Sequence, residues 1–162
     1  KYEEMITADP ENFALNYNYA VELYNKNYGG DDKQSDVASK EKLTNVLKKT
    51  IAIDKGIDAT VLMANHTYNM ASEAVSAASL VKGNKPEDVK KKTELKAVSN
   101  KRMDECISYS DQVVKFYEGM TDLKPKQSAN YKIVLGYLTD IYNLKADAKK
   151  AAEYEKKRAA LK

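Results

Sequence analysis

The sequence predicts an all-α fold built from antiparallel helical hairpins. Apolar residues recur at steps of three and four along most of the 162 residues, which is the spacing of one helix face. Gly- and Pro-containing stretches separate these segments, as expected where helices end. No segment shows the alternation of apolar and polar residues, bounded by turn residues, that indicates a β-strand.

The first half of the chain holds an opening segment and three helices. Residues 1–6 are amphipathic and helix-like, and we expect them to continue an upstream part of a longer protein. A helix starts at Phe13 and stops at the glycine-rich stretch 29–32. A second helix has Ser39 as its expected N-cap and ends near residue 53. A third begins near Asp58, since Asp is a good N-cap, and carries many small residues that would permit close helix contact.

The second half predicts one long helix and a final hairpin. The long helix covers about 95–123, and the charged run 86–93 ahead of it can also be helical, because Pro suits a first turn. The next helices run over about 128–144 and from Asp147 to the end. From the apolar spacing we expect these residues to be buried: Leu47, Ile51, Met63, Val113, Tyr117, Val134 and Leu138.

Composition narrows the classes of function. Charged residues make up 31% and the net charge is only +3, which describes a soluble globular chain without the field of a non-specific nucleic-acid binder. No apolar run approaches the roughly 20 residues that span a bilayer. Twelve Tyr stand against two Phe and no Trp, so we expect many half-exposed rings, because Tyr keeps a polar tip. The compartment is left open among cytoplasm, periplasm and export.

The titratable residues do not suggest an enzyme. His66 is the only His and Cys106 the only Cys, which rules out a multi-Cys metal site. With no second His and a single Cys, we propose neither a set of metal ligands nor a Ser-His or Cys-His base system. We interpret His66 as a structural or surface residue and Cys106 as a packed thiol. No catalytic residue, metal or cofactor is therefore predicted.

Three helix ends share a recurring sequence pattern. Residues 2–10, 47–55 and 116–125 each end a helix at an Asp- or Pro-containing turn, and a new helix follows within a few residues. This sequence pattern resembles that of the tetratricopeptide repeat (TPR), whose helical hairpins follow one another in this way. The positions that match the family's packing positions are Tyr2, Met5, Pro10, Tyr19, Ala20, Leu23, Thr60, Met63, Ala64, Thr67, Tyr117, Pro125, Tyr131, Val134 and Leu138; Asn16 departs from the pattern.

The resemblance implies a right-handed α-α superhelix of about three hairpins in a single TPR-like domain over residues 1–162. The family's regular period of about 34 residues is not kept, because turns and helices are longer here, as in divergent bacterial members with insertions. The alternative is an unrelated antiparallel bundle whose helices end in similar turns.

The resemblance also implies a function, namely binding of a partner peptide or helix in a concave groove lined by the first helix of each hairpin. The residues expected to line it are Tyr17, Asn18, Val21, Asn65, Tyr68 and Asn69. Tyr24-Asn25 repeats the Tyr68-Asn69 pair. The alternative for these tyrosines is packing between neighbouring hairpins.

A second hypothesis for function rests on lysine. Two clusters, around 82–102 and 145–162, carry most of the basic residues of the second half, and they could bind nucleic acid or an anionic surface. Acidic residues are interspersed, which is typical of a solvated helix face. We therefore rank protein binding first and expect no nucleic-acid binding at about 150 mM salt, where weak phosphate contacts are competed away.

Overall fold

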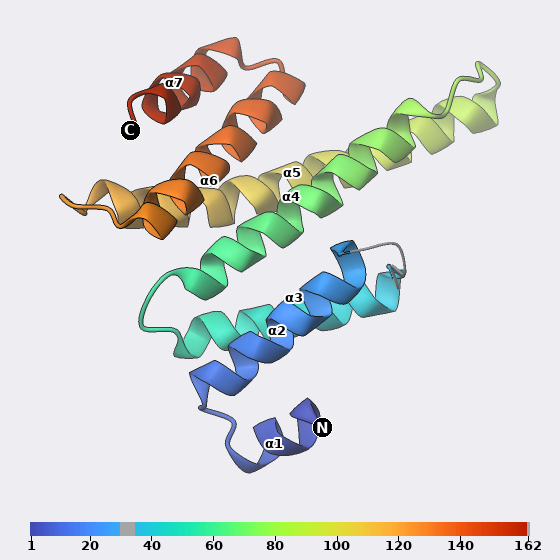
Figure 1. The fold of residues 1–162 in the computed structure, drawn as a ribbon. Helices are drawn as coiled ribbons and strands as arrows, with labels where there is room; N and C mark the ends of the chain where they lie inside the picture. Colours follow the sequence, from blue (N-terminus) through green and yellow to red (C-terminus); the bar gives the residue numbers. More distant parts are fainter. Residues whose placement is uncertain (30–34, 162) are drawn as a thin grey trace. The chain divides into compact units, whose positions relative to one another are not determined.

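The computed structural model describes residues 1–29 and 35–161 (Figure 1), which form helices joined by short connections and contain no strand. The all-α prediction is confirmed. The helices are α1 (Tyr2–Ala8), α2 (Phe13–Tyr28), α3 (Val37–Ile53), α4 (Asp58–Ser79), α5 (Pro86–Glu118), α6 (Pro125–Leu144) and α7 (Ala148–Ala159).

The chain divides into two compact units, Lys1–His66 and Thr67–Lys162, with the boundary inside α4. The first unit holds α1, α2, α3 and the start of α4. The second holds the rest of α4 with α5, α6 and α7. The single TPR-like domain over 1–162 and its superhelix stay predictions.

In the first unit, α2 and α3 form an antiparallel pair. The end of α2 meets the start of α3, where the Asn27 side-chain amide donates to Ser39 Oγ at 2.9 Å. The core between them is apolar and includes Ala20, Leu43 and Leu47, each completely buried. Burial of each of the two leucines contributes about 1.5–3 kcal/mol.

Side-chain caps set the helix starts in this unit. Asn12 caps α2 by accepting from the Leu15 amide at 3.1 Å. Asp36, not the predicted Ser39, caps α3, because its carboxylate accepts from the Ser39 amide at 2.7 Å. Gly29 directly follows α2, and the rest of the predicted stop at 29–32 lies outside the described residues.

In the second unit, α6 packs against both α5 and α7. Tyr117 near the end of α5 meets Tyr131 near the start of α6, so the two helices are antiparallel. Tyr142 near the end of α6 stacks on Tyr154 of α7. Val134, Leu135 and Leu138 of α6 are completely buried, which makes α6 the centre of this core.

The longest helix differs from its predicted bounds. α5 starts at Pro86 and ends at Glu118, whereas apolar spacing placed it at 95–123. Pro86 provides a favourable first position, and the acidic Glu87 and Asp88 suit the positive end of the helix dipole. The charged run 86–93 is therefore part of α5.

The predicted core is largely confirmed. Leu47, Met63, Val113, Tyr117, Val134 and Leu138 are buried, but Ile51 is only half-buried because it lies in the last turn of α3. Four of the twelve tyrosines are buried and the other eight are half-buried. The tyrosines thus combine ring packing with hydroxyl contacts, as expected from their polar tips.

Candidate functional site

The first unit carries an open depression along one face of α2. Its lining includes Asn18, Val21, Asn25 and Gly29, which follow one another at steps of three and four and therefore share a helix face. The opposite face of α2 is buried in the core. The remaining lining residues are Tyr2, Glu22 and Lys26.

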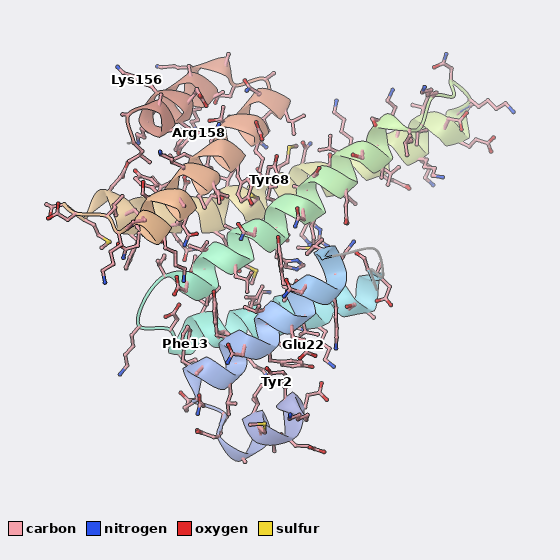
Figure 2. The ribbon with its side chains drawn as sticks, in the orientation of Figure 1. Tyr2, Phe13, Glu22, Tyr68, Lys156 and Arg158 are labelled. Atoms are coloured by element: carbon pink, nitrogen blue, oxygen red, sulfur yellow. The ribbon has the colours of Figure 1, made fainter. Side chains whose placement is uncertain are left out.

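Helix α1 forms one wall of this depression, and three side chains hold it in place. The Tyr2 ring stacks on the Tyr19 ring at 5.3 Å between centroids, and Figure 2 shows Tyr2 between α1 and α2. The Tyr19 hydroxyl donates to Glu3 Oε1 at 2.9 Å. Lys42 of α3 forms an ion pair with the same carboxylate. The hydrogen bond from Lys42, then that from Tyr19, lowers the pKa of Glu3.

The depression offers polar contacts of several kinds beside its apolar ones. Asn18 and Asn25 are exposed, and neither side-chain amide has a hydrogen-bond partner among residues 1–29 and 35–161. Lys26 Nζ lies 2.8 Å from Glu22 Oε1, so this face has both signs of charge without a strong net field. Val21 and the Tyr2 ring add apolar area.

Tyr17 lies on a different side of α2 from Asn18. Its ring stacks on Phe13 at 5.4 Å. Burial, followed by the nearby carboxylates of Asp58 and Asp54, raises the pKa of its hydroxyl. Those two acids flank the turn between α3 and α4. Consecutive helical residues point about 100° apart, so Tyr17 faces that turn while Asn18 faces the depression.

Asn65 is half-buried on α4 and does not line the depression of α2. Its neighbour His66 is completely buried and contacts both other long helices of the unit. Nδ1 lies 2.9 Å from the Tyr28 hydroxyl, and Nε2 lies 2.8 Å from Thr44 Oγ1.

The hydrogen bonds around His66 indicate its tautomer. Thr44 donates its hydroxyl proton to the Lys40 carbonyl at 2.9 Å, so Thr44 Oγ1 accepts from Nε2–H of His66. Nδ1 then accepts from the Tyr28 hydroxyl, because a neutral imidazole has one donor and one acceptor. His66 is therefore a structural residue. The sequence had left open whether it is structural or lies on the surface.

Tyr68 belongs to the second unit, where it joins α4 to α6. Its ring stacks on Tyr137 at 3.9 Å, and its hydroxyl donates to Asp140 Oδ2 at 2.8 Å. Burial and then this hydrogen bond raise the pKa of Tyr68 to about 12. These contacts favour the alternative in which Tyr68 packs between helices. Asn69 is half-buried beside it.

Of the six groove residues predicted from sequence, Asn18 and Val21 thus come together in one depression. Tyr17 and Asn65 lie elsewhere in the first unit, and Tyr68 and Asn69 lie in the second. Sequence reasoning did not include Tyr2, Glu22 and Lys26. Glu22 and Lys26 follow Asn18 at steps of four, and this spacing was the available signal.

The other chemically distinctive residue, Cys106, is a buried thiol. Burial is the main cause that raises its pKa to about 11, which keeps it protonated near neutral pH and unreactive as a nucleophile. It packs with Ala71, Met103 and Ile141. The interpretation of Cys106 as a packed thiol is confirmed.

Three further findings concern metal binding, membrane-spanning helices and similarity to known proteins. Over the described ranges, no three His, Cys, Asp or Glu residues are grouped so that they could hold a metal ion. None of the helices in those ranges has the length and apolarity needed to cross a membrane. No protein-family model, curated protein or solved structure matches the chain.

Proposed function

We propose that this chain is a protein-interaction module, built from TPR-like hairpins, that binds an extended peptide segment of a partner protein in the depression along α2. The observation that carries this proposal is the stripe in which the half-buried Val21 lies between the exposed Asn18 and Asn25. Its two amides are unpaired among the described residues, so a partner can use their donors and acceptors without breaking a hydrogen bond to any of those residues.

The spacing of the stripe suits an extended peptide. Asn18 and Asn25 are seven residues apart on α2, which corresponds to about 10 Å along the helix axis. Three residues of an extended chain also span about 10 Å. The two amides are thus placed to hydrogen-bond the peptide backbone at two points, while Val21 contacts a side chain between them.

The hairpin organisation supports the TPR-like part of the proposal only in places. The pair α6 and α7, with 20 and 12 residues, is close to the family's period of about 34 residues. By contrast, α5 alone has 33 residues. The proposal therefore includes a central hairpin that is much longer than a standard repeat.

A peptide-display selection tests the proposal. Peptides selected on the full chain should lose at least about tenfold in affinity for the variant Asn18→Ala/Asn25→Ala, because two backbone hydrogen bonds of about 1 kcal/mol each are removed. The matched control is Asn45→Ala/Asn100→Ala, which removes two exposed helical amides outside this depression. Circular dichroism would verify that both variants stay folded.

Two results would overturn the proposal. One is a selection that yields no binding peptide. The other is a set of peptides whose affinity falls equally in the control variant, because the binding would then not depend on the stripe of α2.

A further inference from the structure

The second unit has a helical arm that supplies no buried side chain to its core, although the half-buried Val75 packs against that core. The arm consists of the end of α4, the connecting turn and the start of α5, residues 72–98, and none of its side chains is buried. Figure 1 shows this part of α4 and α5 extending beyond α6 and α7. The first buried residue of α5 is Ser99.

Lysine dominates the tip and the α5 side of the arm. From Leu80 to Val98 there are six lysines and three acidic residues, so the net charge of this segment equals the +3 of the whole chain. None of these lysines forms an ion pair with another described residue. Three aliphatic side chains are exposed among them, Leu80 at 75%, Val89 at 53% and Val98 at 48%.

This combination argues against a protein partner for the arm. Protein interfaces are enriched in aromatic residues and Arg and depleted in Lys. Residues 72–98 include no aromatic residue and no Arg. The arm therefore lacks the anchors that usually supply the affinity of a protein contact.

The same composition argues against nucleic acid. Single-stranded nucleic acids are held by aromatic rings on which bases stack, and residues 72–98 include no such ring. In the arm, the exposed lysines provide only point charges. Exposed lysines beside exposed aliphatic side chains are suited to a diffuse anionic surface that lies next to an apolar layer.

We infer that the tip of the arm docks onto an anionic membrane surface. Lysines attract acidic lipid headgroups, and their long stems let the charge stay in the headgroup region while apolar atoms lie deeper. Leu80 and Val89 enter the upper part of the acyl layer, which adds a hydrophobic contribution to the attraction. This inference does not depend on the peptide site of the first unit.

Co-sedimentation with vesicles tests it. The full chain should bind vesicles of phosphatidylcholine and phosphatidylserine at a ratio of about two to one, and not vesicles of phosphatidylcholine alone, because each lysine gains from the anionic headgroups. Lys90→Glu/Lys91→Glu/Lys92→Glu should lower the partition coefficient more than tenfold. Leu80→Ser/Val89→Ser should lower it several-fold.

The matched control is Lys48→Glu/Lys55→Glu/Lys156→Glu, which changes the net charge equally at exposed positions outside the arm. It should keep its partition coefficient within about twofold. Equal losses in both triple variants would overturn the inference, as would absent binding at low salt. Tighter binding to a single-stranded oligonucleotide than to vesicles at the same ionic strength would also overturn it, in favour of nucleic acid.

Discussion

The arm and the C-terminal hairpin, which consists of α6, α7 and the turn between them, are both rich in lysine, but their lysines have different surroundings. In the hairpin, Lys145 Nζ lies 2.9 Å from Asp104 Oδ1, and Lys157 Nζ lies 2.9 Å from Glu118 Oε1. Lys150 lies over the Tyr142 ring at 4.9 Å. In the arm, lysines such as Lys91 have no acidic partner within the described part of the chain.

This difference shows that a cluster of lysines in a sequence does not by itself indicate whether those lysines stabilise the fold or bind a ligand. The hairpin lysines attach α7 and the end of α6 to α5, since Asp104 and Glu118 both lie on α5. Figure 2 shows Lys156 and Arg158 on α7, and Arg158 pairs with Glu155. The lysines of the hairpin therefore stabilise the fold, whereas the lysines of the arm are available to bind an external anion.

The largest expected difference between the regions concerns the core. Val134→Asp in α6 should lower the free energy of unfolding by about 4 kcal/mol or more, because an unpaired charge enters a completely buried position. Val98→Asp in the arm should cost less than about 1 kcal/mol, because Val98 is exposed. Urea unfolding measures both. Equal losses would show that the arm is packed.

A smaller effect is expected at the base of the arm, where Tyr68 bonds to Asp140. Tyr68→Phe should cost about 1 kcal/mol, whereas Tyr109→Phe, whose hydroxyl has no hydrogen bond with another described residue, should cost little. Chemical unfolding of both variants at neutral pH measures this difference. If the two losses were equal, the hydroxyl of Tyr68 would not stabilise the contact with α6.

The pH dependence gives a second readout for Tyr68. Its pKa is about 12, against about 10 for an unfolded tyrosine. Between these values the unfolded chain releases the phenol proton and the folded chain keeps it. The stabilising contribution is therefore complete below pH about 10 and is lost as the pH rises toward 12. Tyr68→Phe should show a shallower loss of stability across this window than the parent chain.

The smallest effect on stability concerns the ion pairs. Lys157→Ala should cost about 1 kcal/mol or less, and added salt should reduce the difference, because exposed pairs are weak and screened. Lys91→Ala should change stability by less than about 0.5 kcal/mol at any salt concentration. Thermal unfolding at low and high salt compares them. A larger or more salt-sensitive loss for Lys91→Ala would reverse the assignment of the clusters.

Local sequence signals predicted the helices well because helical spacing and turn residues act within a few residues. The apolar pattern placed the start of the long helix at about residue 95, because residues 86–93 have no apolar stripe. Only the Pro86 signal indicated that this run can be helical, and the helix there is stabilised by Pro86 and by the acidic first turn rather than by a core. The cap of α3 was placed at Ser39 because Asp36 stands in a polar stretch without a helical pattern.

The site was less predictable from sequence. Helical spacing places Asn18, Val21 and Asn25 on one face, but which face stays open depends on where α1 packs. Tyr68 and Asp140 are 72 residues apart, and no local pattern indicates that they meet. Such tertiary contacts decide whether a polar-aromatic pair lines a surface or joins two helices.

The most direct test of the difference between the lysine clusters is pulse acetylation of the folded chain, followed by mass spectrometry. The hydrogen bond to Glu118 raises the pKa of Lys157, which lowers its reactive neutral fraction, and the Glu118 carboxylate also hinders attack. Lys157 should therefore be acetylated several-fold more slowly than Lys91 and Lys92. Lys145 should also react more slowly than these two, because its amine is held against the Asp104 carboxylate. Equal rates for the two pairs would contradict the assignment of one cluster to stability and the other to binding.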